Sequence, residues 1–230
     1  RYVYVNTNYL WRYDEDTDTW TSRVGGQVLS TNSRVNWVEV APGDSNLIYT
    51  GSGDGQLWMS RDFGATWTRI DRQGLTGGLP NRAITSISAN PLNKNEILIG
   101  LGGSGGNLYR CSNTSAANPT FSDVSGNGAS GLPSVIVNTV VRDPWRPATT
   151  WYVGNDVGVF VTENAGANWT DITQARGLPN VQVNQLLANQ TTGYLTAATF
   201  GRGIWRMKLV PVNLQSVSGN AVISGDSGTA

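Results

Sequence analysis

The side chains available for chemistry are limited by the absence of histidine from all 230 residues. Without an imidazole, a Ser-His-Asp triad, a Cys-His pair and a His-ligated zinc are all excluded. The single cysteine, Cys111, has no second cysteine with which to form an intramolecular disulfide. Any reaction would therefore depend on carboxylates, and any ligand would be held by arginine, aromatic and polar side chains.

Two arginine-bearing segments have the composition of ligand-binding loops. Trp145 and Arg146 end the segment Arg142-Asp-Pro-Trp-Arg146, and an Arg-flanked Trp in a loop suits a platform for a ligand. Arg202 lies between two glycines and could face a ligand as an isolated cation. Each has a structural alternative, because Trp145 could pack against an adjoining sheet and Arg202 could pair with a neighbouring carboxylate.

Asp14, Asp16 and Asp18 alternate along the chain, as some ligands of a calcium loop do. The segment lacks the following glycine and the distal glutamate that complete such a loop, and an acidic hairpin tip is the alternative interpretation. Calcium is the one metal that the sequence suggests, and no other cofactor is predicted.

The charge balance excludes two classes of partner. The chain has 16 basic and 16 acidic residues, and nucleic acids and anionic membranes both require a surplus of positive charge. No apolar run approaches the length that spans a membrane. Charged residues are only 14% of the chain, whereas it has 28 Gly, nine Trp and eight Tyr, which favours many short strands joined by turns.

A repeated segment indicates the architecture. Ser60-Arg-Asp-Phe-Gly-Ala-Thr-Trp67 recurs as Thr162-Glu-Asn-Ala-Gly-Ala-Asn-Trp169, and degenerate copies end at Trp20 and Phe121. Short strands with alternating apolar residues surround each copy, four to a unit of about 50 residues, which is the period of a propeller blade. We therefore predict an all-β fold, a β-propeller of four-stranded antiparallel blades.

The first unit lacks its innermost strand and the last unit its outermost strand. The chain is accordingly expected to hold three whole and two partial blades over residues 1–209, which could be the C-terminal part of a larger propeller. Residues 210–230 contain no aromatic side chain and are rich in Ser and Gly. They are predicted to be a linker or the start of a following domain.

The repeated segment is predicted to form a tight turn between the two outer strands of a blade. Its aspartate can accept hydrogen bonds from backbone N–H groups, its glycine permits a positive φ, and its tryptophan can pack between blades. We assign this structural role to two sets of residues: Ser60, Asp62, Gly64 and Trp67, and Thr162, Asn164, Gly166 and Trp169.

With these motifs, the chain resembles the Asp-box (BNR-repeat) β-propellers. The segments Tyr152–Gly166, Gly177–Val181 and Ala197–Trp205 are most similar to the final blades of secreted bacterial sortilin/xyloglucanase-like proteins. The resemblance covers residues 1–209. It implies a location outside the cell, at the cell surface or in the periplasm, and a place in a longer multidomain chain.

The resemblance also implies a candidate catalytic pair. In the xyloglucanase-like family a catalytic Asp lies in a strand-end motif, and Asp156 aligns with it, although Val159 replaces the second glycine of that motif. Glu39, in Trp37-Val-Glu39, is a loose counterpart of the family's second acid. Two such carboxylates would suit hydrolysis of a glycosidic bond. Alternatively, Asp156 caps a turn, as the segment Gly53-Asp-Gly55 is expected to do in an earlier blade.

Intact turn motifs beside an altered catalytic motif favour a non-catalytic interaction module that binds a polysaccharide or a protein partner. The alternatives are a glycoside hydrolase acting on β-glucan or xyloglucan through Asp156, and an architectural segment of a surface filament or adhesin.

Overall fold

The computed structural model describes residues 1–105, 107–209, 213–217 and 220–224. Their regular secondary structure consists of antiparallel β-strands and two single-turn 3-10 helices, η1 (Gly128–Ser130) and η2 (Gln174–Arg176). No helix in the described ranges has the length and apolar character needed to cross a membrane.

Five sheets of three or four strands follow one another along the chain. Sheet A contains β1 (Tyr2–Asn6), β2 (Leu10–Asp14) and β3 (Thr19–Thr21). Sheet B contains β4 (Val35–Val40), β5 (Ile48–Ser52), β6 (Leu57–Ser60) and β7 (Thr68–Arg69). Sheet C contains β8 (Ile84–Asn90), β9 (Asn93–Leu101), β10 (Leu108–Cys111) and β11 (Phe121–Asp123).

Sheet D contains β12 (Val137–Arg142), β13 (Trp151–Asn155), β14 (Gly158–Thr162) and β15 (Thr170–Asp171). Sheet E contains β16 (Val183–Asn189), β17 (Tyr194–Thr199) and β18 (Gly203–Lys208). A separate two-stranded hairpin consists of β19 (Asn213–Val217) and β20 (Asn220–Ser224). The linker or following domain predicted at 210–230 lies partly outside the described residues.

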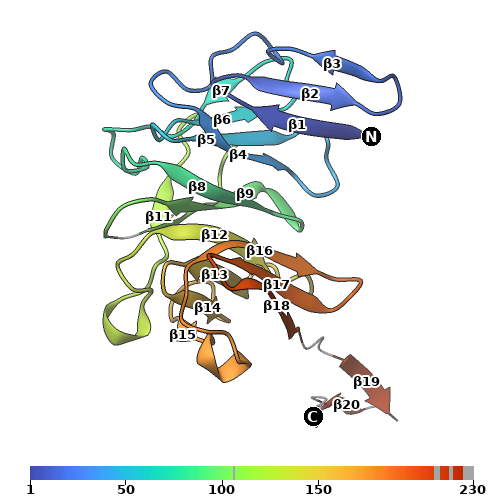
Figure 1. The fold of residues 1–230 in the computed structure, drawn as a ribbon, viewed down its shortest axis with the longest axis vertical. Coiled ribbons are helices and arrows are strands. Elements are labelled where there is room, and N and C mark those ends of the chain that lie inside the picture. Colours follow the sequence, from blue (N-terminus) through green and yellow to red (C-terminus); the bar gives the residue numbers. More distant parts are fainter. Residues whose placement is uncertain (106, 210–212, 218–219, 225–230) are drawn as a thin grey trace.

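The five sheets pack face to face in chain order, as the blades of a propeller do (Figure 1). A separate apolar cluster fills each of the four gaps between neighbouring sheets. The predicted all-β propeller with three whole and two partial blades is therefore confirmed. Alternating apolar residues explain the arrangement, because each inner sheet must bury side chains on both faces.

The two partial blades lack different strands. In sheet A the acidic hairpin joins β2 to β3, as the repeated turn joins β6 to β7, so β1 corresponds to the second strand of a whole blade. β1 also packs against β4 in the way that β5 packs against β8. Sheet E ends at β18 and so contains the first three strands of a blade.

The loops lie at two opposite rims. The rim that we call the crossover rim carries the loops β5–β6, β9–β10, β13–β14 and β17–β18, together with the connections between successive sheets. The opposite one, the turn rim, carries the loops β4–β5, β8–β9 and β12–β13 and the repeated turns. Antiparallel pairing fixes this division, because every second loop returns to the same end of the strands.

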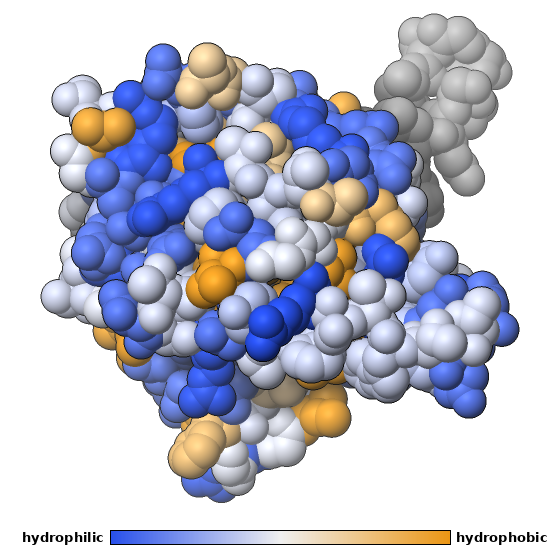
Figure 2. Space-filling model, turned by 90° about the horizontal axis from the view of Figure 1, so that it is seen from above, coloured by the Kyte–Doolittle hydropathy of each residue, from blue (hydrophilic) through white to orange (hydrophobic). Residues whose placement is uncertain are grey.

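Sheets A and E leave one face each without a neighbouring sheet. On sheet A this face carries Val3, Val5 and Trp20, and on sheet E it carries Leu187 and Ile204, all of them exposed. Figure 2 views the molecule from the sheet A end and shows apolar residues interspersed with hydrophilic ones. These faces have apolar side chains at the positions that are buried in the inner sheets.

Candidate functional site

The two intact copies of the repeated segment form turns with the same hydrogen bonds. In the first, Ser60 Oγ donates to Asp62 Oδ1 at 2.8 Å, Gly64 N donates to Ser60 Oγ at 2.8 Å, and Thr66 N donates to Asp62 Oδ1 at 2.8 Å. The hydroxyl of Thr66, which donates to Asp62 Oδ2 at 2.6 Å, lowers the pKa of Asp62 together with the bonds from Thr66 N and Ser60 Oγ. The aspartate is thus occupied by its own turn.

In the second copy the pattern is kept with different side chains. Thr162 Oγ1 donates to Asn164 Oδ1 at 2.9 Å, and Gly166 N and Asn168 N donate to Thr162 Oγ1 and Asn164 Oδ1. Gly166 has φ +88°, and a Cβ there would lie 2.6 Å from Val124 O. The turn therefore needs an acceptor at Asn164 rather than a negative charge.

The tryptophan that ends each turn anchors it to the preceding sheet or its connection. Trp67 Nε1 donates to Val24 O at 3.1 Å, and Trp169 Nε1 donates to Val124 O at 3.0 Å. Phe121, at the same position in sheet C, is buried in the apolar cluster between sheets B and C. All these aromatic residues serve packing and are not available to a ligand.

Trp145 and Arg146 lie at the turn rim, in the β12–β13 loop. Trp145 is partly buried and packs against the apolar cluster between sheets D and E. Arg146 is paired with Glu163 at 3.4 Å and lies 3.8 Å from Asp143. Trp145 thus packs against the adjoining sheet, which was the alternative to a ligand platform. Trp145 and Arg146 lie at the opposite rim from Arg202.

The innermost strands of sheets B to E share a β-bulge at the crossover rim. The bulge falls after the first residue of each strand and leaves one polar side chain there: Asn36, Thr85, Asn138 and Asn184. Asn36 Nδ2 donates to Ile84 O at 3.1 Å, and Thr85 Oγ1 donates to Val137 O. Asn36 and Thr85 thus each fasten their sheet to the first residue of the next inner strand.

Asn138 departs from this pattern. Its amide Nδ2 donates at 2.9 Å to Asp156 Oδ1, in the β13–β14 loop of its own sheet. Asp156 is exposed at the crossover rim. Asn36 and Thr85 each bond to the next sheet. Asn138 instead holds the carboxylate of Asp156 at the rim.

Asp156 does not play the part that Asp54 plays in sheet B. Asp54 accepts the backbone N–H groups of Thr31 and Asn32 at 2.9 Å each and the hydroxyls of Ser30 and Ser52. Partial burial alone would raise the pKa of Asp54, but these hydrogen bonds lower it to about 2. Asp54 is a structural cap.

In sheet D the turn is capped by the preceding residue. Asn155 Oδ1 accepts the N–H groups of Val157 at 2.9 Å and Gly158 at 3.0 Å. The turn is therefore complete without the carboxylate of Asp156, and the expected equivalence with Gly53-Asp-Gly55 does not hold. Asp156 is left facing solvent from a loop that does not need it.

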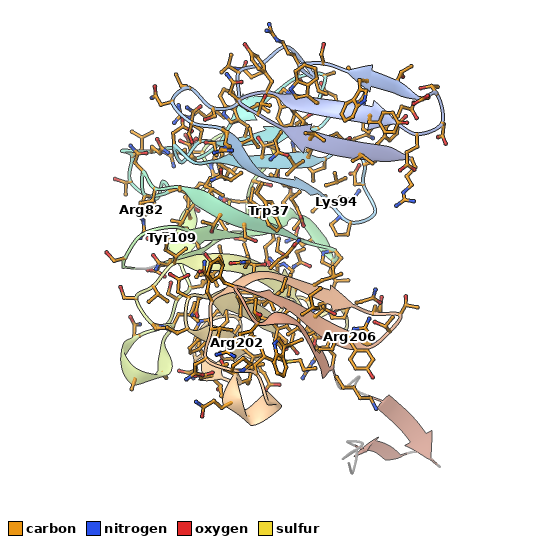
Figure 3. All side chains as sticks on the ribbon, in the orientation of Figure 1. Trp37, Arg82, Lys94, Tyr109, Arg202 and Arg206 are labelled. Atoms are coloured by element: carbon orange, nitrogen blue, oxygen red, sulfur yellow. The ribbon has the colours of Figure 1, made fainter. Side chains whose placement is uncertain are left out.

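The equivalent loop of sheet E carries an exposed ring and a cation. Phe200 is 70% exposed, and Arg202 is exposed two residues further on. The loop is held by bonds from Phe200 N to Gln182 O and from Trp205 Nε1 to Arg202 O, both at 2.9 Å. Figure 3 shows Arg82 and Lys94 on opposite sides of the ribbon and Arg202 below both, towards the sheet E end.

The candidate site is thus the crossover rim of sheets D and E, with Asp156, Asn138, Phe200 and Arg202. Sequence reasoning identified Asp156 and Arg202 but missed Phe200 and Asn138. The signal for Asn138 was present in the sequence, because the inner strands of sheets B, D and E all begin Val-Asn. An exposed apolar ring and a cation on one loop, with a carboxylate at the same rim of the neighbouring sheet, suit contact with a polar ligand that also has apolar faces.

Glu39 lies far from this rim along the strand direction. It is near the turn-rim end of β4, where it pairs with Tyr49, and its Oε1 accepts the N–H of Ala89 in sheet C at 3.0 Å. Burial raises the pKa of Glu39 to about 7, although the bond from Ala89 N, the nearby indole of Trp37 and the charge of Arg142 oppose the rise. The structure therefore does not bring Glu39 and Asp156 together.

Glu39→Gln is expected to stabilise the fold by about 2 kcal/mol at pH 8 and to have no effect at pH 4. The folded pKa of about 7 exceeds the unfolded value of 4.5, so the folded state keeps a proton that the unfolded state releases as the pH rises between them. The stability that protonation supplies is complete below pH 4.5 and is lost as the pH rises through 7.

Urea unfolding at both pH values would measure this effect. Glu163→Gln, at a carboxylate whose side chain is 69% exposed, is the matched control and should give the same small change at both. Equal stabilisation by Glu39→Gln at pH 4 and pH 8 would contradict the assignment of the effect to titration.

The acidic hairpin of sheet A does not gather its carboxylates. Asp16 Oδ2 accepts the amino terminus of Arg1 at 2.8 Å, and Asp18 Oδ1 accepts Tyr13 OH at 2.7 Å. Asp14 Oδ1 accepts the N–H of Asp16 at 3.0 Å. The three side chains have separate partners and do not fit a calcium site, and no other group of three acidic or cysteine residues in the described ranges converges on one point.

These features define the fold as a β-propeller of three whole and two partial blades, in which turns capped by side chains join the two outer strands of a blade. No protein-family model and no curated protein matches it. Among solved structures, a GH74 enzyme from Niastella koreensis superimposes on 90% of the chain with a TM-score of 0.66 and 17% identity. The GH74 xyloglucanase from Xanthomonas campestris matches 90% with a TM-score of 0.63 and 20% identity.

The extracellular domain of a hybrid two-component system from B. thetaiotaomicron matches 95% of the chain, with a TM-score of 0.64 and 19% identity. The chain spans 34% of the length of each of the two GH74 structures and 27% of the third. At these identities the likeness shows the propeller fold.

Proposed function

We propose that this chain is a non-catalytic β-propeller segment of an extracellular or cell-envelope protein that binds a polysaccharide at the crossover rim of sheets D and E. The observation that carries the proposal is the Asn138–Asp156 pair. Asn155 already caps the turn, so the carboxylate of Asp156 has no role in it. The amide of Asn138, on the inner strand, donates a hydrogen bond to this carboxylate.

The neighbouring loop supplies complementary chemistry. Phe200 offers an apolar face on which a sugar ring can lie, and Arg202 offers several N–H donors for sugar hydroxyls. Both loops are exposed, and an open rim suits a polymer that extends beyond the protein better than a small molecule that needs an enclosed cavity. The likeness in fold to a GH74 xyloglucanase supports a polysaccharide ligand.

Phe200→Ala is expected to weaken binding to xyloglucan or mixed-linkage β-glucan about tenfold, because it removes the exposed apolar contact. Asp156→Asn and Arg202→Ala should each weaken it less. Affinity electrophoresis in gels containing each polysaccharide would measure the changes. Leu92→Ala, at an equally exposed apolar residue of the turn rim, is the control and should bind as the unchanged protein does.

Hydrolysis is the second candidate, and the raised pKa of Glu39 favours it because a general acid must hold a proton near neutral pH. The separation of Glu39 from Asp156 argues against hydrolysis, because both carboxylates must flank one glycosidic bond. Release of reducing ends from either polysaccharide, abolished by Asp156→Asn, would replace the binding proposal with a hydrolase. A protein partner in place of the polysaccharide would leave both polysaccharide assays without signal.

A further inference from the structure

A groove of about 480 Å³ lies at the outer edge of the molecule between sheets B and C, away from the crossover rim of sheets D and E. One wall is the β6–β7 hairpin, with Arg61, Thr68 and Arg69. The other wall is the β10–β11 loop from Thr114 to Pro119. This loop is longer than the repeated turns, and its length creates the second wall.

The groove is positively charged in a chain with no net charge. Three of its lining residues are arginines and none is Asp or Glu. Arg69 is neutralised by Asp71, with bonds of 2.7 and 3.1 Å. Arg61 and Arg72 bond only to neutral acceptors, Asn95 Oδ1 at 3.4 Å and Pro119 O at 3.3 Å.

Each of these two guanidinium groups has five N–H donors, so most remain available to a ligand. Planar guanidinium forks match carboxylates in a bidentate geometry. Arg61 also borders a second hollow of about 260 Å³ towards the turn rim, where Lys94 is paired with Asp44 at 2.8 Å. The charge of the groove therefore selects an anionic ligand.

The groove also borders an exposed sheet edge. β7 is the outermost strand of sheet B, and Ile70 N donates to Leu57 O on its inner side. The alternation of antiparallel pairing then directs the N–H and C=O of Arg69 outward, where an extended chain can pair with them. Leu75, 60% exposed, adds an aliphatic surface, and no aromatic ring lines the groove.

We infer that this groove binds an extended acidic peptide segment, which lies along β7 and places its carboxylates at Arg61 and Arg72. The peptide backbone would add to the edge strand β7, and its carboxylates would pair with Arg61 and Arg72, which have no acidic partner in the described ranges. The absence of an aromatic platform among the lining residues favours a peptide over an acidic glycan.

The test uses a fluorescein-labelled peptide of about eight residues with alternating Glu and Val, and a matched peptide with Gln in place of Glu. Fluorescence anisotropy with the whole chain should show binding of the Glu peptide that weakens as salt is added. Arg61→Gln combined with Arg72→Gln should weaken it at least about tenfold. Arg34→Gln combined with Arg206→Gln, which removes the same charge elsewhere, should change it less than twofold.

Three results would overturn the inference. The Gln peptide could bind as tightly as the Glu peptide, or the double variant of Arg61 and Arg72 could bind as the unchanged protein does. Alternatively, oligogalacturonate could bind more tightly than the peptide with the same dependence on both arginines, which would assign the groove to acidic glycans. The thermal midpoint of each variant, compared with the unchanged protein, shows whether it is folded.

Discussion

Trp151→Ala is expected to lower the free energy of unfolding by about 4 kcal/mol. Trp151 is completely buried, in the apolar cluster between sheets C and D. Its indole Nε1 donates to Pro147 O at 2.9 Å, and the guanidinium of Arg142 lies 5.3 Å from the ring centroid. Truncation leaves a cavity and a buried cation without its aromatic neighbour, and it removes one of the two hydrogen bonds to Pro147 O, the other being from Arg142 Nη1 at 2.7 Å.

Urea unfolding monitored by circular dichroism would measure this loss. The control is Trp20→Ala, because Trp20 is 55% exposed on the open face of sheet A, and its loss should cost about 1 kcal/mol or less. Trp151→Phe keeps most of the apolar volume and should cost about 2 kcal/mol. This variant tests the same packing if the alanine variant does not fold. Equal costs for Trp151→Ala and Trp20→Ala would contradict the packing assigned to the cluster.

The second large effect is expected at a buried ion pair between sheets C and D. Glu96→Gln should lower the free energy of unfolding by about 3 kcal/mol. Glu96 Oε1 lies 3.0 Å from Arg142 Nη1 and its Oε2 lies 2.5 Å from Arg110 Nη2, and the side chains of Glu96 and Arg142 are only 4% and 3% exposed. Without the negative charge, the buried guanidinium of Arg142 would lose its carboxylate and be left beside Arg110, whose side chain is 34% exposed.

The pH dependence separates this effect from packing. Burial would raise the pKa of Glu96, but the hydrogen bond from Arg110 and the charges of both arginines lower it below 4.5. The stability that Glu96 supplies is therefore present above pH 4.5 and is lost as the pH falls through its folded pKa. The cost of Glu96→Gln should shrink in the same range.

Glu163→Gln is the matched control, because the Glu163–Arg146 pair at 3.4 Å is exposed and should contribute about 0.5 kcal/mol or less. A cost of Glu96→Gln that stays constant from pH 7 to pH 3 would show that shape, rather than charge, stabilises the site.

The blade count and the strand positions followed from the sequence because they depend on local periodicity. The predicted four-stranded units are sheets B, C and D, and Phe121 occupies the position of the turn tryptophan in sheet C. Such patterns need only the alternation of a strand and the turn chemistry between strands. Each is encoded within a single unit of the repeat.

The roles of individual carboxylates did not follow, because they depend on contacts between units. Asp54 and Asp156 follow equivalent strands, but four residues separate β5 from β6 and only two separate β13 from β14. The shorter loop is capped by Asn155, which frees Asp156. Likewise, Arg142 and Glu96 are distant in sequence, and nothing local marks them as partners.

The bulge residues have a consequence for how such a chain can change in length. In the bonds from Asn36 and Thr85, the earlier sheet supplies the side chain and the later sheet supplies a backbone carbonyl, which is present whatever residue occupies that position. A whole blade can therefore be duplicated or removed without loss of the fastening at the new junction. Because the acceptor is a backbone carbonyl, the hydrogen bond does not depend on the sequence of the later sheet. The number of blades can therefore vary while each blade acquires its own rim loops.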